Sequence, residues 1–325
     1  SIISWVVQYV LSIITNKIYH NKKYWLFCGT EDGLINLKRE VEINQKKFKV
    51  KLIDPNYNKK QLDLNEIDGV IIENNENINL DQIFFFKSKG ITVINSLKWC
   101  ELMLHRMPPY LIVNKYQIIE NFNLSDNSYK IKIKRLGDLF ISLLLIVLTL
   151  PISFLIILFI YLEDRGPILY SQLRTGYKGE RMRIYKFRSM IINAEKSGPQ
   201  WAKNEDKRIT KIGKIIRAMR IDELPQLLAV LDGKMSLIGP RPERPELEEK
   251  FLEEIPFYKY RTILKPGISG WAQVNYPYGA SLEDSINKLS YDIYYINHIS
   301  FLFDLLILFK TIKTVFNAKG YRSKI

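Results

Sequence analysis

The feature that most constrains this 325-residue chain is a long uncharged run between Leu139 and Leu162. About 24 apolar residues in a helix are enough to cross the roughly 30 Å hydrocarbon core of a bilayer. The alternative is a helix buried in a soluble protein, but soluble helices of this length usually keep one polar face. The run therefore predicts a membrane helix over residues 136–162.

Pro151 interrupts this run, where it removes a backbone hydrogen bond and favours a bend. If the sheet domain before the run and the basic domain after it are both cytosolic, a single crossing is impossible, because it would place them on opposite sides of the membrane. We therefore expect a re-entrant helix–break–helix that enters and leaves on one face. Thr149 and Ser153 can satisfy carbonyls freed by the proline. Asp138 is expected to pair with Arg135 or with the second half of the hairpin.

The formal net charge of +14 belongs mainly to the second part of the chain. Residues 21–130 carry 16 Lys and Arg against 14 Asp and Glu, whereas residues 131–325 carry 31 against 20. A basic surface suits nucleic acid, anionic lipid head groups or phosphorylated substrates. The aromatic-interleaved motifs of the common RNA folds are missing. We therefore expect membrane lipids and phosphate groups as partners, and no nucleic acid.

Residues 21–128 alternate short apolar runs with polar helical stretches, a pattern that favours a small parallel α/β sheet. The apolar runs are 24–27, 48–53, 69–72 and 91–94. Gly29 and Gly33 follow the first run as a weak remnant of a dinucleotide fingerprint, but Glu31 and Asp32 stand where a pyrophosphate would approach. The segment predicts a degenerate Rossmann-like domain with a structural or regulatory role. Residues 1–20 are expected to be the end of a truncated transmembrane segment or a linker helix.

Residues 131–325 are expected to form a second, mainly α domain attached to one face of the membrane. Two of its segments, 208–221 and 301–316, have the amphipathic or apolar character of helices lying in the head-group layer. A plain core helix remains open for each. The fold class expected for the whole chain is α/β, with the small sheet domain first and the monotopic helical domain second.

Asp222 and Glu223 place two adjacent carboxylates directly behind the basic segment 208–220. A carboxylate surrounded by cations is expected to stay ionised with a depressed pKa, available as a nucleophile or a metal ligand. An acidic pair at an ordinary helix start is the plain alternative. Leu224-Pro225 fits the first turn of a helix, where proline lacks no needed partner.

Eight sequence motifs follow the membrane run or flank it in a fixed order. They are Lys134-Arg135-Leu136-Gly137-Asp138, Gly166-Pro167, Arg174-Thr175-Gly176, Lys186-Phe187-Arg188-Ser189-Met190, Asp222-Glu223-Leu224-Pro225-Gln226-Leu227, Ser236-Leu237-Ile238-Gly239-Pro240-Arg241-Pro242, Lys265-Pro266-Gly267-Ile268-Ser269-Gly270-Trp271-Ala272-Gln273-Val274 and Tyr291-Asp292-Ile293-Tyr294-Tyr295. Over residues 131–320 the series resembles the bacterial sugar transferase family, the monotopic polyprenyl-phosphate glycosyl-1-phosphate transferases. The first part resembles the nucleotide-binding-like, CoA-binding-like domain of the larger members.

The resemblance implies transfer of a sugar 1-phosphate from a UDP-sugar to undecaprenyl phosphate, with release of UMP. It implies Asp222 as the nucleophile that carries the phosphosugar and as a ligand of Mg²⁺, and Glu223 as a helper of the lipid acceptor. Large members most often use UDP-hexoses, which favours galactose or glucose, although the residues themselves do not distinguish the sugar. The reaction would initiate exopolysaccharide, capsule or O-antigen synthesis on the cytoplasmic face of the bacterial inner membrane. A homodimer is compatible with this organisation.

The same resemblance implies a set of site residues, each with a plain structural alternative such as a turn, a packing side chain or a solvated strand. Those expected to bind substrate phosphate are Lys186, Arg188, Arg217, Gly239, Pro240, Arg241 and Pro242. Those expected to line the site are Gly270, Trp271, Gln273 and Asp292. The alternative function is a membrane-anchored regulatory protein that binds a nucleotide sugar and has an inactive transferase-like domain.

Overall fold

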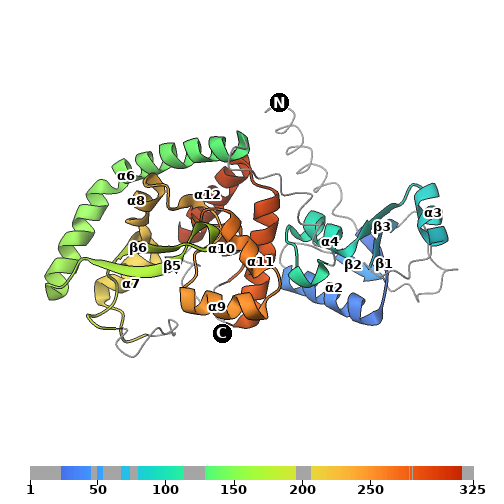
Figure 1. Ribbon diagram of the computed structural model, residues 1–325, viewed down its shortest axis with the longest axis horizontal. Coiled ribbons are helices and arrows are strands. Elements are labelled where there is room, and N and C mark those ends of the chain that lie inside the picture. The colour runs from blue at the N-terminus through green and yellow to red at the C-terminus, as the bar shows by residue number, and fades with distance from the viewer. Residues whose placement is uncertain are drawn as a thin grey trace. The chain divides into compact units, whose positions relative to one another are not determined.

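The computed structural model describes residues 23–44, 50–53, 67–73, 80–112, 129–194, 206–277, 279 and 281–316. The chain divides into two compact units, one ending at Met107 and one beginning at Pro108 (Figure 1). The segment 1–20, predicted to be a membrane or linker helix, lies outside the described residues.

The first unit contains a four-stranded sheet whose strands are all parallel (Figure 1). The strand order is β2 (Val50–Ile53), β1 (Lys23–Cys28), β3 (Ile67–Ile72) and β4 (Thr92–Asn95). Helices α2 (Glu31–Asn44) and α3 (Leu80–Ser88) lie between strands in the sequence, and α4 (Ser96–Trp99) follows the last strand. The predicted parallel α/β sheet is confirmed.

Large apolar side chains fill the interior of this unit. Trp25, Phe27, Ile71 and Trp99 are all buried, and the two indoles meet edge to face with ring centroids 6.3 Å apart. Gly69 pairs with Trp25 across the sheet, and a Cβ at Gly69 would lie 2.3 Å from the indole. The glycine is therefore needed to admit the ring.

The glycine turn after β1 is filled by a carboxylate of the protein itself. Glu73, the residue after β3, accepts hydrogen bonds from the Thr30 amide at 2.6 Å and from the Thr30 hydroxyl. A Cβ at Gly29 or Gly33 would lie within 2.6 Å of Glu73 atoms. Glu73 thus takes the place, at the start of α2, that an anion occupies in nucleotide-binding folds.

The second unit is mostly helical. It contains a hairpin of β5 (Leu169–Thr175) and β6 (Arg181–Phe187) and a parallel pair of β7 (Ser236–Ile238) and β8 (Gly267–Ser269). Its helices are α6 (Tyr129–Asp164), α7 (Lys211–Ala218), α8 (Gln226–Leu231), α9 (Pro245–Glu254), α10 (Trp271–Asn275), α11 (Leu282–Asn297) and α12 (Phe301–Phe316). The expected mixed α/β class with a mainly helical second part is confirmed.

Helix α6 is longer than predicted and is visibly bent in Figure 1, but it continues through Pro151 as one helix, so the predicted break at Pro151 is wrong. Its burial is the reverse of that in a soluble helix. Lys134, Asp138 and Ser142 are buried at four-residue spacing, whereas apolar side chains such as Phe140 and Phe154 are about 70% exposed. Polar groups facing protein and apolar groups facing outward are the pattern of a helix in lipid. Among the described residues, α6 is the one helix long and apolar enough to cross a membrane, with a mean hydropathy of 3.1 in its most apolar window.

Pro151 lies on the exposed side of α6. The Thr149 hydroxyl donates to the carbonyl of Leu145 at 2.7 Å, a contact that tends to bend helices. It does not reach the carbonyl of Val147, which the proline leaves without its helical partner, so the expectation for Thr149 is wrong in this detail. Asp138 likewise bonds to β7 and lies 3.8 Å from Lys134 rather than pairing with Arg135.

Candidate active site

Asp222 and Glu223 lie in a single turn of 3₁₀ helix, η6 (Ile221–Glu223), between α7 and α8. Arg220, which follows α7 and immediately precedes η6, is in the left-handed conformation, with φ 57°, and so turns the chain into the pair. Pro225 then caps α8. Both carboxylates are buried, which makes their charges expensive unless they are compensated.

Glu223 is compensated by three cations from different elements. Its Oε1 accepts from Lys186 Nζ of β6 at 2.8 Å and from Arg241 Nη2 at 2.7 Å, and its Oε2 lies 3.7 Å from Arg220 Nη1. Burial alone would raise the pKa of Glu223, but Arg241, Lys186 and Arg220 together hold it well below its ordinary value. Glu223 is therefore ionised throughout the physiological range.

Asp222 has the opposite surroundings. Its Oδ1 is buried and has no hydrogen-bond partner in the described part of the chain. Burial raises the pKa of Asp222, the charge of Glu223 raises it further, and Lys186, Arg220 and Arg217 offset this only in part. The expected depressed pKa is thus wrong for Asp222 and holds for its neighbour, because the basic side chains bond to Glu223.

The loop 239–242 carries Arg241 to the pair and leaves the end of β7. Close backbone packing against β8 fixes this loop: Gly239 N donates to the Ser269 carbonyl, and Gly267 N donates to the Pro240 carbonyl, both at 2.9 Å. A Cβ on Gly239, Gly267 or Gly270 would come within about 2.5 Å of the facing backbone. The motifs 236–242 and 265–274 therefore pack against each other, and together they hold the loop that carries Arg241.

Arg261 holds the same loop from the other side. Its Nη2 donates to the carbonyl of Arg241 at 2.9 Å, and its Nε donates to Asp292 Oδ2 at 2.8 Å. Asp292 is fully buried, and burial raises its pKa although the Arg261 charge opposes the shift. Asp292 thus lies in an ion pair behind the loop rather than beside Asp222.

The site thus contains two buried adjacent carboxylates. Glu223 is ion-paired with Lys186 and with Arg241, which stands between two prolines, whereas Asp222 keeps an oxygen without a hydrogen-bond partner among the described residues. The residues on either side of the pair pack against the long apolar helix α6. Comparison with known proteins matches the model for bacterial sugar transferases to residues 129–318, more than half of the chain. The chain belongs to the bacterial sugar transferase family. The predicted family is thereby confirmed.

Relatives of this sugar transferase carry related names. It is 48% identical over 190 residues to a UDP-N-acetylgalactosamine-undecaprenyl-phosphate N-acetylgalactosaminephosphotransferase of Aeromonas hydrophila, covering 58% of the chain and 45% of the relative. It is 35% identical over 212 residues to a UDP-glucose:undecaprenyl-phosphate glucose-1-phosphate transferase of Klebsiella pneumoniae, covering 64% and 46%. It is 33% identical over 218 residues to an undecaprenyl-phosphate galactose phosphotransferase of Salmonella typhimurium, covering 61% and 43%. The chain thus spans less than half the length of these three relatives.

The other residues predicted for this sugar transferase fall into two groups. Lys186 and Arg241 contact Glu223, and Arg217 is close enough to lower the pKa of Asp222, so these three lie around the carboxylate pair. Gly239, Pro240 and Pro242 belong to the loop that carries Arg241. Arg188 lies elsewhere: it is buried and bonds to Asp164 at the end of α6. Its contact ties β6 to α6.

The predicted site-lining residues support the loop instead of facing the pair in the contacts that the structure shows. Gly270 packs against the carbonyl of Gly239, and Gln273 donates to the carbonyl of Ile268. Trp271 is buried against Tyr294 and Phe303, with Lys310 Nζ 4.2 Å from its ring centroid. Packing is the plain alternative that sequence analysis left open for the tryptophan.

Sequence analysis did not select three arginines of the site. Arg220 adjoins the pair in the sequence, so the local charge pattern could have identified it. Arg174 stands in the motif Arg174-Thr175-Gly176, in which sequence analysis assigns the arginine no role, and it donates to the carbonyl of Pro242 at 3.2 Å. Arg261 lacks a sequence signal, because it reaches the loop from a distant element. Burial lowers the pKa of Arg174 to about 10, with Arg241 adding to the effect.

Proposed function

We propose that this chain transfers a sugar 1-phosphate from a UDP-sugar to undecaprenyl phosphate and releases UMP. Family membership and the names of the relatives support the reaction class. The observation that carries the assignment of residues is the contrast within the pair. Glu223 is fully engaged by Lys186 and Arg241, whereas Asp222 keeps a buried oxygen without a partner.

In the first step, an oxygen of Asp222 attacks the β-phosphorus of the UDP-sugar. The bond from that phosphorus to the bridging oxygen breaks, and UMP leaves with the electron pair. The sugar 1-phosphate is then held as an acyl phosphate on Asp222. In the second step, a phosphate oxygen of undecaprenyl phosphate attacks the same phosphorus and the Asp222 carboxylate leaves, which gives undecaprenyl diphosphate sugar.

Positive charge around the pair serves these steps by stabilising the phosphoryl oxygens. Arg241 presents a planar fork suited to phosphate, and Lys186 presents a point charge. Lys186 and Arg241 both bond to Glu223, which holds them in place for the phosphate groups of the substrates. Glu223 would take part by releasing them to the incoming phosphate and by remaining an anion beside the lipid phosphate.

Mg²⁺ is the expected cofactor, and the residues fit it in one respect. Asp222 offers a buried oxygen that lacks a partner, whereas no group of three or more His, Cys, Asp or Glu ligands occurs among the described residues. Mg²⁺ commonly binds one or two carboxylates and completes its shell with water and substrate phosphates. Bound there, it would offset the charge of the diphosphate.

We further propose that α6 is re-entrant in the cytoplasmic leaflet of the inner membrane. Near its start, Arg135 donates to the carbonyls of Val230 and Leu231. At its end, Glu163 accepts from the backbone amides of Lys211 and Ile212. Both ends are thus bound to the same compact unit, which supports entry and exit on one side.

The pair also lies beside apolar surface that suits a lipid substrate. Ile215 on α7, Met219 at the residue after it and Leu228 on α8 are more than half exposed. These helices directly precede and follow η6. An exposed apolar rim here would let the phosphate of a membrane-embedded polyprenol reach Asp222 while the nucleotide sugar arrives from water.

The test is a transfer assay with the detergent-purified protein, Mg²⁺, undecaprenyl phosphate and, in parallel, UDP-N-acetylgalactosamine, UDP-glucose and UDP-galactose. We expect UMP from at least one donor, and Asp222→Asn should lower the rate on the order of a thousandfold or more. With donor alone, peptide mass mapping should find the phosphosugar on Asp222. Asp232→Asn, at an exposed aspartate ten residues away, is the matched control. Release of UDP, or an undiminished rate with Asp222→Asn, would overturn the proposal.

A further inference from the structure

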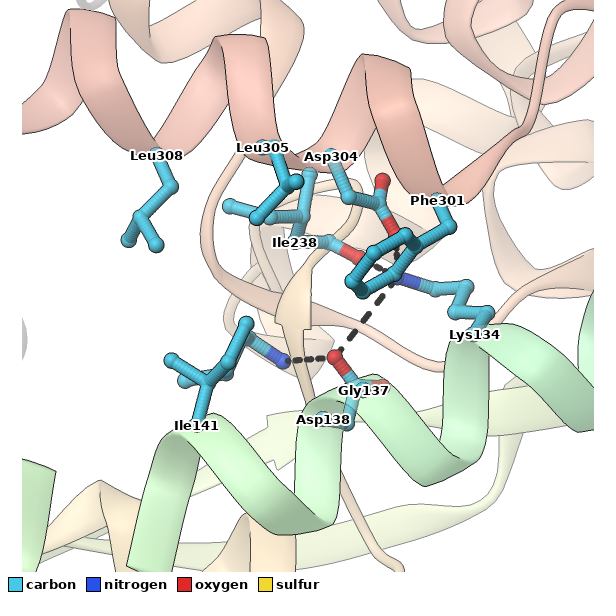
Figure 2. Close-up of a pocket in the computed structure, with 10 residues that line it drawn as sticks. Lys134, Gly137, Asp138, Ile141, Ile238, Phe301, Asp304, Leu305 and Leu308 are labelled. Atoms are coloured by element: carbon cyan, nitrogen blue, oxygen red, sulfur yellow. Dashed lines mark hydrogen bonds and ion pairs between the residues drawn. The ribbon is translucent and has the colours of Figure 1, made fainter. Parts of the chain in front are cut away.

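A buried charge cluster joins the start of α6 to α12 and β7 (Figure 2). Lys134 Nζ donates to Asp304 Oδ2 and to the carbonyl of Ile238, both at 2.8 Å, and lies 3.8 Å from Asp138 Oδ1. Figure 2 shows these side chains pointing toward one another from α6 and α12 around Ile238. The cluster lies at the end of the strand that leads into the Arg241 loop.

All three charged residues are more than 90% buried. Each carboxylate has further donors: Ser236 and the amide of Leu237 donate to Asp138, and Tyr295 donates to Asp304 at 2.6 Å. A buried ionic network of this kind is seldom the most stabilising way to fill a core. What it supplies is a defined geometry, because every member has directional partners.

The geometry is fixed at the residue from which the active loop departs. Ile238 is the last residue of β7 and stands three positions before Arg241, which bonds to Glu223 at 2.7 Å. The next residue of α6, Arg135, holds the last carbonyls of α8, the helix that follows the carboxylate pair. The first turns of α6 therefore contact both elements that border the site.

We propose that Lys134 is a positioning residue that couples the seating of membrane helix α6 to the placement of Arg241. This inference rests on the proposed function for its kinetic consequence. Lys134 holds the Ile238 carbonyl, the carbonyl sets the exit of the loop, and the loop sets the contact of Arg241 with Glu223.

Tyr295 cannot replace Lys134 in this role while Asp304 is ionised. Its hydroxyl has one proton, and the hydroxyl oxygen lies 2.6 Å from Asp304 Oδ1 but 3.2 Å from the Ile238 carbonyl. The proton is therefore engaged by the carboxylate. The Ser236 hydroxyl, 2.8 Å from the Ile238 carbonyl and 2.7 Å from Asp138 Oδ2, also has a single proton for two acceptors. Lys134 has three protons, so it can donate to Ile238 and to Asp304 at the same time.

The first experiment does not depend on catalysis. Phenylglyoxal modifies exposed arginines, and peptide mapping gives the rate at Arg241 in the full chain without substrate. We expect Lys134→Met to raise that rate several-fold, since Arg241 loses its fixed contact with Glu223. Lys132→Met, on an exposed position of the same helix, should not change it. An unchanged rate at Arg241 in Lys134→Met would overturn the inference even if the transfer reaction holds.

The second experiment separates positioning from stability. Lys134→Met leaves Asp304 buried without its cation, so the melting temperature should fall. Lys134→Met with Asp304→Asn removes the 2.8 Å ion pair, and Asp138 keeps its donors from Ser236 and the Leu237 amide. The double variant should recover much of the lost melting temperature, while kcat should stay about 10-fold to 100-fold below wild type. In an Arg241→Ala background the Lys134→Met effect on kcat should vanish. Recovery of kcat together with melting temperature, or a full Lys134→Met effect without Arg241, would overturn the role; absence of UMP release by the wild type would instead sink the proposed function.

Discussion

Asp222 and Glu223 are neighbours in the chain, yet their carboxylates have opposite electrostatic surroundings. Glu223 is surrounded by Lys186, Arg241 and Arg220. Burial alone would raise its pKa, but these three cations hold the pKa well below the ordinary value. Burial and the Glu223 charge raise the pKa of Asp222. Two carboxyl groups whose surroundings shift their pKa values in opposite directions are typical of sites in which similar side chains have different roles.

This contrast predicts that Asp222 lowers the stability of the protein. A carboxyl with a raised folded-state pKa is penalised once it ionises, so stability falls as pH rises from the ordinary value of 3.8 through the raised one. Asp222→Asn should therefore raise the melting temperature at pH 7 by a few degrees, about what 1 kcal/mol produces. The gain should shrink as pH approaches 4. Differential scanning calorimetry without substrate checks this, and a gain independent of pH would contradict it.

At the scale of elements, α6 is both the helix that we propose to enter the membrane and a support of the candidate site. Its first half packs Ile141 and Leu145 against the main core, and its second half packs Ile156 and Ile160 against Phe187 and Ile216. The outward side chains between these contacts are apolar and exposed. A helix held at both ends by one unit has little freedom to place those ends on opposite sides of a bilayer.

The corresponding prediction concerns sidedness. Single cysteines would replace exposed Lys132, before the apolar run, and exposed Leu169, after it. Both cysteines should react with an impermeant maleimide in inside-out vesicles, and neither should react in right-side-out vesicles. Cys28 would be changed to serine, whereas Cys100 is buried with a raised pKa and should stay unreactive. Labelling of the two positions from opposite sides would show a full crossing.

Elements with strong periodicity or length could be predicted from the sequence, including the four parallel strands, α6 and α12. The placement of charged side chains could not. Arg188 stands two residues from Lys186 and reads as an equal phosphate ligand, but it bonds to Asp164 of α6. Which carboxylate the cations neutralise depends on the left-handed turn at Arg220 and on loops brought in by β7, and neither leaves a local sequence signal.

At the scale of the whole molecule, the family match covers the second unit alone. The first unit has the strand order of a nucleotide-binding sheet but a carboxylate where the phosphate would lie. Glu73 satisfies the amide and hydroxyl of Thr30 and fills the space above Gly33. Its negative charge at the start of α2 is favourable in the same way as a bound anion.

We therefore expect the first unit to bind no nucleotide. NAD, ADP and coenzyme A should not change its melting temperature. Glu73→Ala should lower the free energy of unfolding by about 1–2 kcal/mol, because two hydrogen bonds to a charged group are lost. Glu31→Ala, at an exposed acidic residue of the same helix start, is the matched control and should have little effect. Urea unfolding measures both, and a nucleotide-induced rise in the wild type would contradict the prediction.

The engagement of Glu223 also bears on how a protein with a formal charge of +14 discriminates among cellular anions. Glu223 is a counterion that belongs to the protein itself. An anion that binds at Lys186 and Arg241 must therefore displace the Glu223 carboxylate from both side chains. The ion pairs that a lone inorganic phosphate would form with Lys186 and Arg241 are little stronger than the ion pairs with Glu223 that they replace. A ligand that brings a diphosphate, its own cation and a contact with Asp222 gains several interactions for the same exchange. We therefore expect the proposed site to select against small anions independently of any contact with a sugar or a nucleoside.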